Sequence, residues 1–191
     1  MKKTVLQAAC LLLLAVMISC SSKMDTYPEG YEEGDEYFSM KEFFDDQWKN
    51  KSELPYVYAK VTKVNDVVED SVIMDWTNEA FAEIREEFEK ADIGAPGHLG
   101  KYNFTLLEDM NSRTLLYEAL DKDAFTQKLI LVLDAENNKI TSVYAETKDE
   151  GIFSTENSKM TYIPDGTIQI VKFRKHMFSK KKEIIITYKF L

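Results

Sequence analysis

Two stretches of the sequence repeat apolar residues at the spacing of an amphipathic helix. In the first stretch Ser39 and Glu42 form the pattern of a capping box, and Phe38 and Phe43 stand where a hydrophobic staple would fix the entry of the chain. The pattern predicts a short helix from residue 40 to about residue 50, ending before the proline at position 55.

The second helical pattern occupies residues 77–91, TNEAFAEIREEFEKA. Thr77 is a suitable cap, and Trp76 is placed to staple against Phe81. Apolar residues then recur at helical spacing as Phe81, Ile84, Phe88 and Ala91. The glycines and proline of residues 94–100, GAPGHLG, predict the end of this helix.

Elsewhere the pattern has period two, which is typical of strands. Residues 56–64 and 71–76 are rich in β-branched and aromatic residues and predict a hairpin with its turn region between them. Seven more candidate strands follow, at residues 102–107, 114–120, 127–133, 139–147, 159–163, 167–174 and 183–190. Their short polar connections favour hairpins, and successive hairpins predict an antiparallel meander.

Two of these strands predict the surroundings of the sheet. Residues 128–133, KLILVL, are apolar on both faces, which suggests a central strand covered on both sides. In residues 168–173, IQIVKF, the apolar residues move from one face of the strand to the other, and we interpret this shift as a β-bulge. The predicted fold class is therefore α+β: a curved antiparallel meander of about 7–9 strands packed against two helices in the N-terminal half. One globular domain is expected over residues 38–191.

The N-terminus has the pattern of an export signal. Lys2 and Lys3 precede an apolar run over residues 5–18, which is shorter than the roughly 20 residues that a spanning helix needs. The residues Met17, Ile18, Ser19 and Cys20 resemble a bacterial lipobox. The resemblance implies cleavage after Ser19 and a lipid anchor on Cys20. An ordinary signal peptide that leaves Cys20 free, or an uncleaved membrane helix, would be the alternatives.

Residues 20–37 are acidic and contain almost no aliphatic side chains, so we expect a flexible tether between the anchor and the domain. Because Ser21 and not aspartate follows the cysteine, the enterobacterial sorting rule favours the outer membrane. The sequence leaves open which side of that membrane the domain faces.

Charge and cysteine content exclude several function classes. The formal net charge is −9, so nucleic acid is not an expected partner. The chain has two cysteines, Cys10 and Cys20, and the predicted processing removes or modifies both. No zinc or iron–sulfur site built on cysteine is therefore expected.

Candidate catalytic and metal-binding residues are few. The two histidines, His98 and His176, are far apart in the sequence, and no nucleophile and orienting acid accompany either of them. Residues 134–139, DAENNK, lack the acidic spacing of a calcium loop. We therefore predict no catalytic residues, no metal site and no cofactor, and a hydrolase is only a third hypothesis.

Candidate binding residues are aromatic or basic. Trp48, Tyr56 and Tyr58 would bind a glycan ring or a protein pocket if they are exposed, although their spacing also suits core packing. Lys180, Lys181 and Lys182 would contact anionic groups, such as lipid headgroups, or would instead protect an edge strand from aggregation.

Taken together, the signal, the acidic tether and the motifs WTNEAFAEIREEFEKADI, KYNF and YIPDGTIQI resemble small lipoproteins of the Bacteroidota type. This resemblance implies location in the cell envelope and implies no particular activity. The leading hypothesis is a non-enzymatic binding or scaffolding module for an envelope protein or a glycan. The alternative is a carrier of an apolar ligand, a lipid or acyl chain, which predicts a continuous apolar cavity of several hundred Å³, roughly the size of ordinary ligand pockets.

Overall fold

The computed structural model describes residues 37–52, 56–75 and 77–191. They form two α-helices, α2 (Met40–Lys51) and α3 (Asn78–Glu89), and one short 3₁₀ turn, η2 (Pro96–His98). The strands are β1 (Val57–Val64), β2 (Val67–Asp75), β3 (Tyr102–Glu108), β4 (Ser112–Ala119), β5 (Thr126–Asp134), β6 (Ile140–Glu150), β7 (Ser154–Tyr162), β8 (Thr167–His176) and β9 (Lys182–Phe190). The signal peptide, Cys20 and all of the tether before Tyr37 lie outside the described residues.

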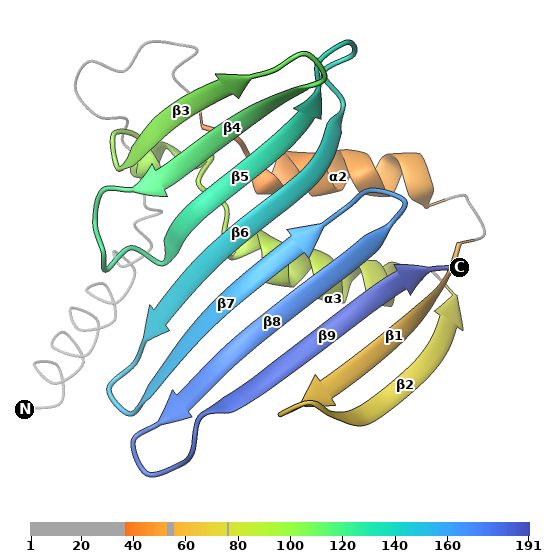
Figure 1. Cartoon of the computed structure of the whole chain (residues 1–191), viewed down its shortest axis with the longest axis vertical. Helices are drawn as coiled ribbons and strands as arrows, with labels where there is room; N and C mark the ends of the chain where they lie inside the picture. The colour runs from red at the N-terminus through yellow and green to blue at the C-terminus, as the bar shows by residue number, and fades with distance from the viewer. Residues whose placement is uncertain (1–36, 53–55, 76) are drawn as a thin grey trace, which may run out of the picture.

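All nine strands belong to one open, curved, antiparallel sheet with the order β2-β1-β9-β8-β7-β6-β5-β4-β3. Both helices lie on the same face of this sheet (Figure 1). The predicted α+β class is thus confirmed. Strands β3 to β9 form a continuous meander, while the N-terminal hairpin of β1 and β2 joins the sheet through pairing of β1 with β9.

The helix caps form as predicted. The Ser39 hydroxyl accepts a hydrogen bond from the Glu42 backbone N–H, and the rings of Phe38 and Phe43 lie 5.8 Å apart. Thr77 caps α3 by accepting a hydrogen bond from the Ala80 N–H. Trp76, the predicted staple of α3, lies outside the described residues.

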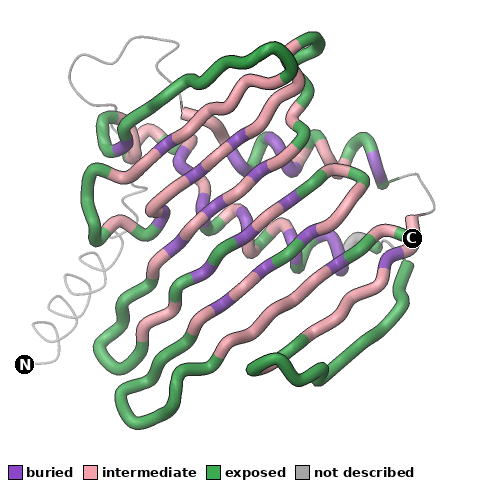
Figure 2. Tube along the Cα trace, viewed as in Figure 1, coloured by how far each residue is buried: buried purple, intermediate pink, exposed green. Residues whose placement is uncertain are grey.

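Aromatic side chains fill the space between the helices and the sheet. Phe44 of α2 packs against Phe88 of α3 and against Tyr162 of β7, with ring centroids 5.3 Å and 5.1 Å apart. Buried residues recur at every second position of the inner strands (Figure 2). The core is therefore built from one face of the sheet and the inward stripes of both helices.

The turn between β1 and β2 is shorter than the sequence predicted. Asn65 and Asp66 both have positive φ, of 48° and 66°, so a two-residue turn joins the strands directly. Strand β2 therefore begins at Val67 and not at position 71. Strand β7 is also longer than predicted because its polar first half pairs with both neighbours.

Two predictions about the sheet are wrong. The register of β8 with β7 and β9 is continuous, so there is no bulge in residues 168–173. Ile168 and Ile170 face the helices and Val171 and Phe173 face away, which is ordinary alternation. The register shifts lie instead in β1, between Thr62 and Lys63, and in β5.

Strand β5 is covered on one face by the core, and no described element covers its other face. Ile130 and Val132 on that second face are half-buried by their neighbours within the sheet. The prediction that both faces of this strand are covered is therefore wrong for the described part of the chain. None of the described helices is long and apolar enough to cross a membrane.

Candidate functional site

The three aromatic residues predicted to bind a partner differ in their access to solvent. Tyr58 of β1 is 1% exposed and belongs to the core. Trp48 of α2 is half-buried, with its ring 4.9 Å from that of Phe81. Tyr56 is half-buried against Phe190. These residues do not form a common exposed platform on which a sugar ring could stack.

Tyr56 belongs to a cluster around a buried lysine. The Lys51 ammonium lies 2.9 Å from an Asp165 carboxylate oxygen and 5.4–5.8 Å from the ring centroids of Tyr56, Tyr162 and Phe190. The hydrogen bond from Lys51 holds the pKa of Asp165 below its usual value, although desolvation of the carboxyl opposes this effect. The cluster fastens the end of α2 to the turn between β7 and β8, and its charges are mutually satisfied.

A hollow of about 240 Å³ lies between α3 and the helix-facing side of β6, β7 and β8. Lys172 projects into it and pairs with Glu87 of α3, while Arg174 pairs with Glu156. Burial by itself would raise the pKa of Glu87, but hydrogen bonds from Lys172 and Lys90 lower it. The hollow is thus an ion-pair network in which the cations already have partners.

The hollow also bears on the carrier hypothesis, which needs an apolar cavity. The hollow is lined largely by charged and hydroxyl groups, and the adjoining space between helices and sheet is filled by the aromatic core. A carrier role therefore stays a prediction that no cavity of the described residues supports.

The two histidines lie on different elements of the fold. His98 is in the 3₁₀ turn, where burial, with a smaller effect of Lys101, lowers its pKa. His176 ends β8 opposite Ser154 of β7. Among the described residues, no group of three or more His, Cys, Asp or Glu side chains is placed to hold a metal ion.

Both edges of the sheet carry exposed apolar side chains. All nine residues of β2 are exposed, and Figure 2 shows this strand in the colour of exposed residues along its whole length. Its exposed apolar side chains are Val67, Val68, Val72, Ile73 and Met74. No described strand pairs with the outer side of β2. At the opposite edge, β3 exposes Phe104, Leu106 and Leu107.

Sequence reasoning placed β2 in a hairpin but did not identify it as an edge. Its sequence, VVEDSVIMD, has consecutive apolar residues in two places and no strict alternation, so the pattern did not identify a buried and an exposed face. The position at the edge could not be found, because it depends on the pairing of β1 with β9.

Lys180, Lys181 and Lys182 lie at the turn between β8 and β9. Both strands are interior to the sheet, so these lysines do not protect a sheet edge, and that alternative is wrong. They belong to a surface that we name the double turn, formed by residues 151–154 and 175–182. The backbone N–H of Met177 donates to the carbonyl of Phe153, 2.9 Å away, which joins the two turns.

No protein-family model and no curated protein matches this chain. Among solved structures, the chain is similar to the crystal structure of a LolA superfamily protein from Nitrosomonas europaea. That alignment covers 80% of this chain and 92% of the other, with 9% sequence identity and a TM-score of 0.24.

Proposed function

We propose that this chain is a lipid-anchored lipoprotein of the outer membrane whose domain binds another envelope protein without catalysing a reaction. In this proposal, β2 accepts an extended segment of the partner, which becomes an additional strand of the sheet. The lipobox-like residues that end at Cys20 support the anchor and the location. The exposed strand β2 carries the binding hypothesis.

Strand β2 has the features that strand addition requires. Its outer backbone groups have no described strand beside them, and a row of free N–H and C=O groups is a template for another strand. Five of its nine residues are exposed apolar side chains, so a partner strand could bury apolar area on both faces. These side chains stabilise the isolated domain little, because they are largely in contact with water.

A protein partner suits this surface better than a glycan does. Of the aromatic residues predicted to stack on a sugar ring, Tyr58 is buried and Trp48 packs on Phe81. Backbone hydrogen bonds along an edge, by contrast, are specific to a polypeptide in extended conformation.

Photo-crosslinking in intact cells tests the proposal. A crosslinking amino acid at Ser71, on exposed β2, should give a discrete protein adduct, whereas the same group at Thr141, exposed on the interior strand β6, should not. The substitution Ile73→Lys should reduce the yield of the Ser71 adduct about tenfold, because charge on an edge strand opposes pairing.

Met110→Lys is the control, since Met110 is also an exposed apolar residue and lies in the turn between β3 and β4. It should leave the Ser71 adduct unchanged. Equal adducts from Ser71 and Thr141, or an adduct that is insensitive to Ile73→Lys, would show that β2 is not the binding edge.

A further inference from the structure

The central residues of both turns in the double turn are apolar. The Gly151 N–H donates to the carbonyl of Ser154 at 2.8 Å, so Ile152 and Phe153 occupy the middle of the first turn. The Ser179 N–H donates to the carbonyl of His176 at 3.2 Å, so Met177 and Phe178 occupy the middle of the second. Hairpin turns normally place glycine, asparagine or aspartate at these positions.

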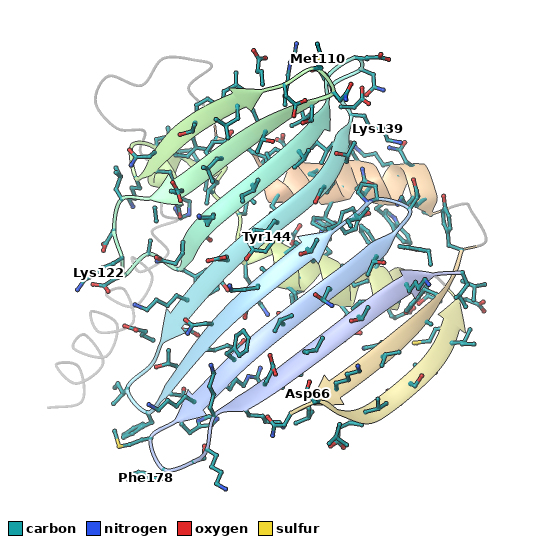
Figure 3. The ribbon with its side chains drawn as sticks, viewed as in Figure 1. Asp66, Met110, Lys122, Lys139, Tyr144 and Phe178 are labelled. Carbon is teal, nitrogen blue, oxygen red and sulfur yellow. The ribbon has the colours of Figure 1, made fainter. Side chains whose placement is uncertain are left out.

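These four side chains contribute little to the folding of the domain. Ile152 is 86% exposed and Phe178 is 93% exposed, and Phe153 and Met177 are also exposed. Figure 3 shows Phe178 at one extreme end of the molecule and Met110 at the opposite end. The apolar residues therefore form a protruding end of the sheet and are no extension of the core.

Positive charge surrounds this apolar end in an otherwise acidic protein. Residues 175–182 contain four lysines and no carboxylate, and residues 151–154 contain no charged side chain. On the neighbouring strand ends, Glu150 pairs with Lys148 and Glu156 pairs with Arg174, while Glu183 directly follows Lys182. The lysines of the double turn have no carboxylate partner among the described residues.

The geometry between the two turns suits a charged headgroup. A hollow of about 210 Å³ is lined by Ile152, Phe153 and Met177 together with Lys175 and His176. The Lys181 ammonium lies over the ring of Phe173, 4.5 Å from its centroid. Apolar side chains and Lys175 thus share one small surface.

We propose that the double turn is a membrane-docking tip for an anionic phospholipid bilayer. Ile152, Phe153, Met177 and Phe178 enter the headgroup region, while the lysines contact lipid phosphates. An anionic surface is the occupant that matches both properties of the tip, because a zwitterionic surface lacks the net negative potential that attracts lysines, and a soluble anion leaves the apolar residues in water. This surface is separate from β2, so the proposal does not depend on strand addition.

The test uses the full chain reconstituted in vesicles, with tryptophan as a local probe. Phe178→Trp and Met110→Trp are matched variants, since the two native residues are 93% and 96% exposed at opposite ends of the molecule. Quenching of tryptophan fluorescence by brominated lipid is measured relative to the parent chain, which contains Trp48 and Trp76. The vesicles contain either phosphatidylcholine alone or phosphatidylcholine with about one third phosphatidylglycerol.

The proposal predicts quenching at position 178 in anionic vesicles only, and none at position 110 in either vesicle. One basic residue near an anionic surface changes affinity by about fivefold. Changing Lys180, Lys181 and Lys182 together to glutamine should therefore shift the docking equilibrium by about 100-fold and remove the quenching. Raising the salt concentration to about 1 M, where the screening length is near 3 Å, should have the same effect.

Two results would overturn the proposal. One is equal quenching at positions 178 and 110, which would mean that the domain has no preferred end toward the bilayer. The other is quenching at position 178 that depends neither on the anionic lipid nor on the three lysines. Because all the substituted side chains are exposed, loss of folding is not expected to obscure either result.

Discussion

Replacing Asp165 with asparagine tests the role of the buried lysine that fastens α2 to the sheet. The Lys51 side chain is 6% exposed and that of Asp165 is 52% exposed, with 2.9 Å between the charged atoms. Asparagine has nearly the same size and tolerates the positive φ of 59° at this position. The substitution therefore removes the negative charge while leaving the turn intact.

Asp165→Asn should cost less stability than removing one partner of a fully buried ion pair. Removing one partner of such a pair costs about 3–5 kcal/mol, because the other charge stays buried without compensation. Here Asp165 is half exposed and screened by water, and Lys51 keeps its contacts with three aromatic rings. We expect Asp165→Asn to lower the free energy of unfolding by about 1–2 kcal/mol at pH 7.

The stabilisation by the Lys51–Asp165 ion pair should depend on pH. Lys51 lowers the pKa of Asp165 in the folded state, so the folded protein holds the carboxylate form more strongly than the unfolded chain does. The stabilisation is fully present above the unfolded pKa, about 3.9, and is lost as the pH falls through the lower folded value. The difference between the parent and Asp165→Asn should thus be constant from pH 6 to 8 and shrink below about pH 4.

Urea unfolding, followed by intrinsic fluorescence at several pH values, measures this difference. Asp46→Asn is the control, because the Lys49–Asp46 pair is exposed on both sides and should contribute little. Adding Lys51→Met to Asp165→Asn should restore part of the loss, since no unpaired charge is then buried. A loss no larger than that of Asp46→Asn, or one that is unchanged at pH 3, would refute the reasoning.

Three further predictions concern the core, the turn and the anchor. Phe44→Ala should lower the free energy of unfolding by about 3–5 kcal/mol in the same urea assay, because a fully buried ring between both helices and Tyr162 is lost; a loss below about 1 kcal/mol would contradict the described core. Asp66→Ala should cost about 1 kcal/mol, since alanine tolerates φ of 66° poorly, whereas Asp66→Gly should be close to neutral. Cys20→Ala should abolish incorporation of labelled palmitate in growing cells, and persistent labelling would refute the predicted anchor.

The elements of the fold could be predicted from sequence wherever a local pattern determines them. The caps at Ser39 and Thr77 depend on residues within one helical turn, so the sequence contains the whole of the information. The start of β2 was predicted too late because Asn65 and Asp66 can form a two-residue turn by themselves, and Val67 was assigned to the connection. A bulge was predicted in β8 because both of its faces carry apolar residues. Their regular alternation was interpreted as a shift from one face to the other.

The candidate surfaces depend on contacts between distant residues, which local patterns do not contain. That Lys180 and its neighbours stand at an interior turn follows from the position of β9 between β1 and β8. The apolar turn residues Ile152 and Phe178 were detectable, since hydrophobic side chains at the centre of hairpin turns are unusual. Their union into one surface was not, because it rests on the hydrogen bond between Met177 and Phe153.

The pairing of β1 with β9 has a consequence for the order of assembly during biogenesis. Tyr58 lies opposite Phe190, so the hairpin of β1 and β2 has no neighbour in the sheet until β9 is in place. Contacts between such distant positions slow folding, because the intervening chain must first be brought together. The sheet is therefore complete only when β9 has paired with both β1 and β8.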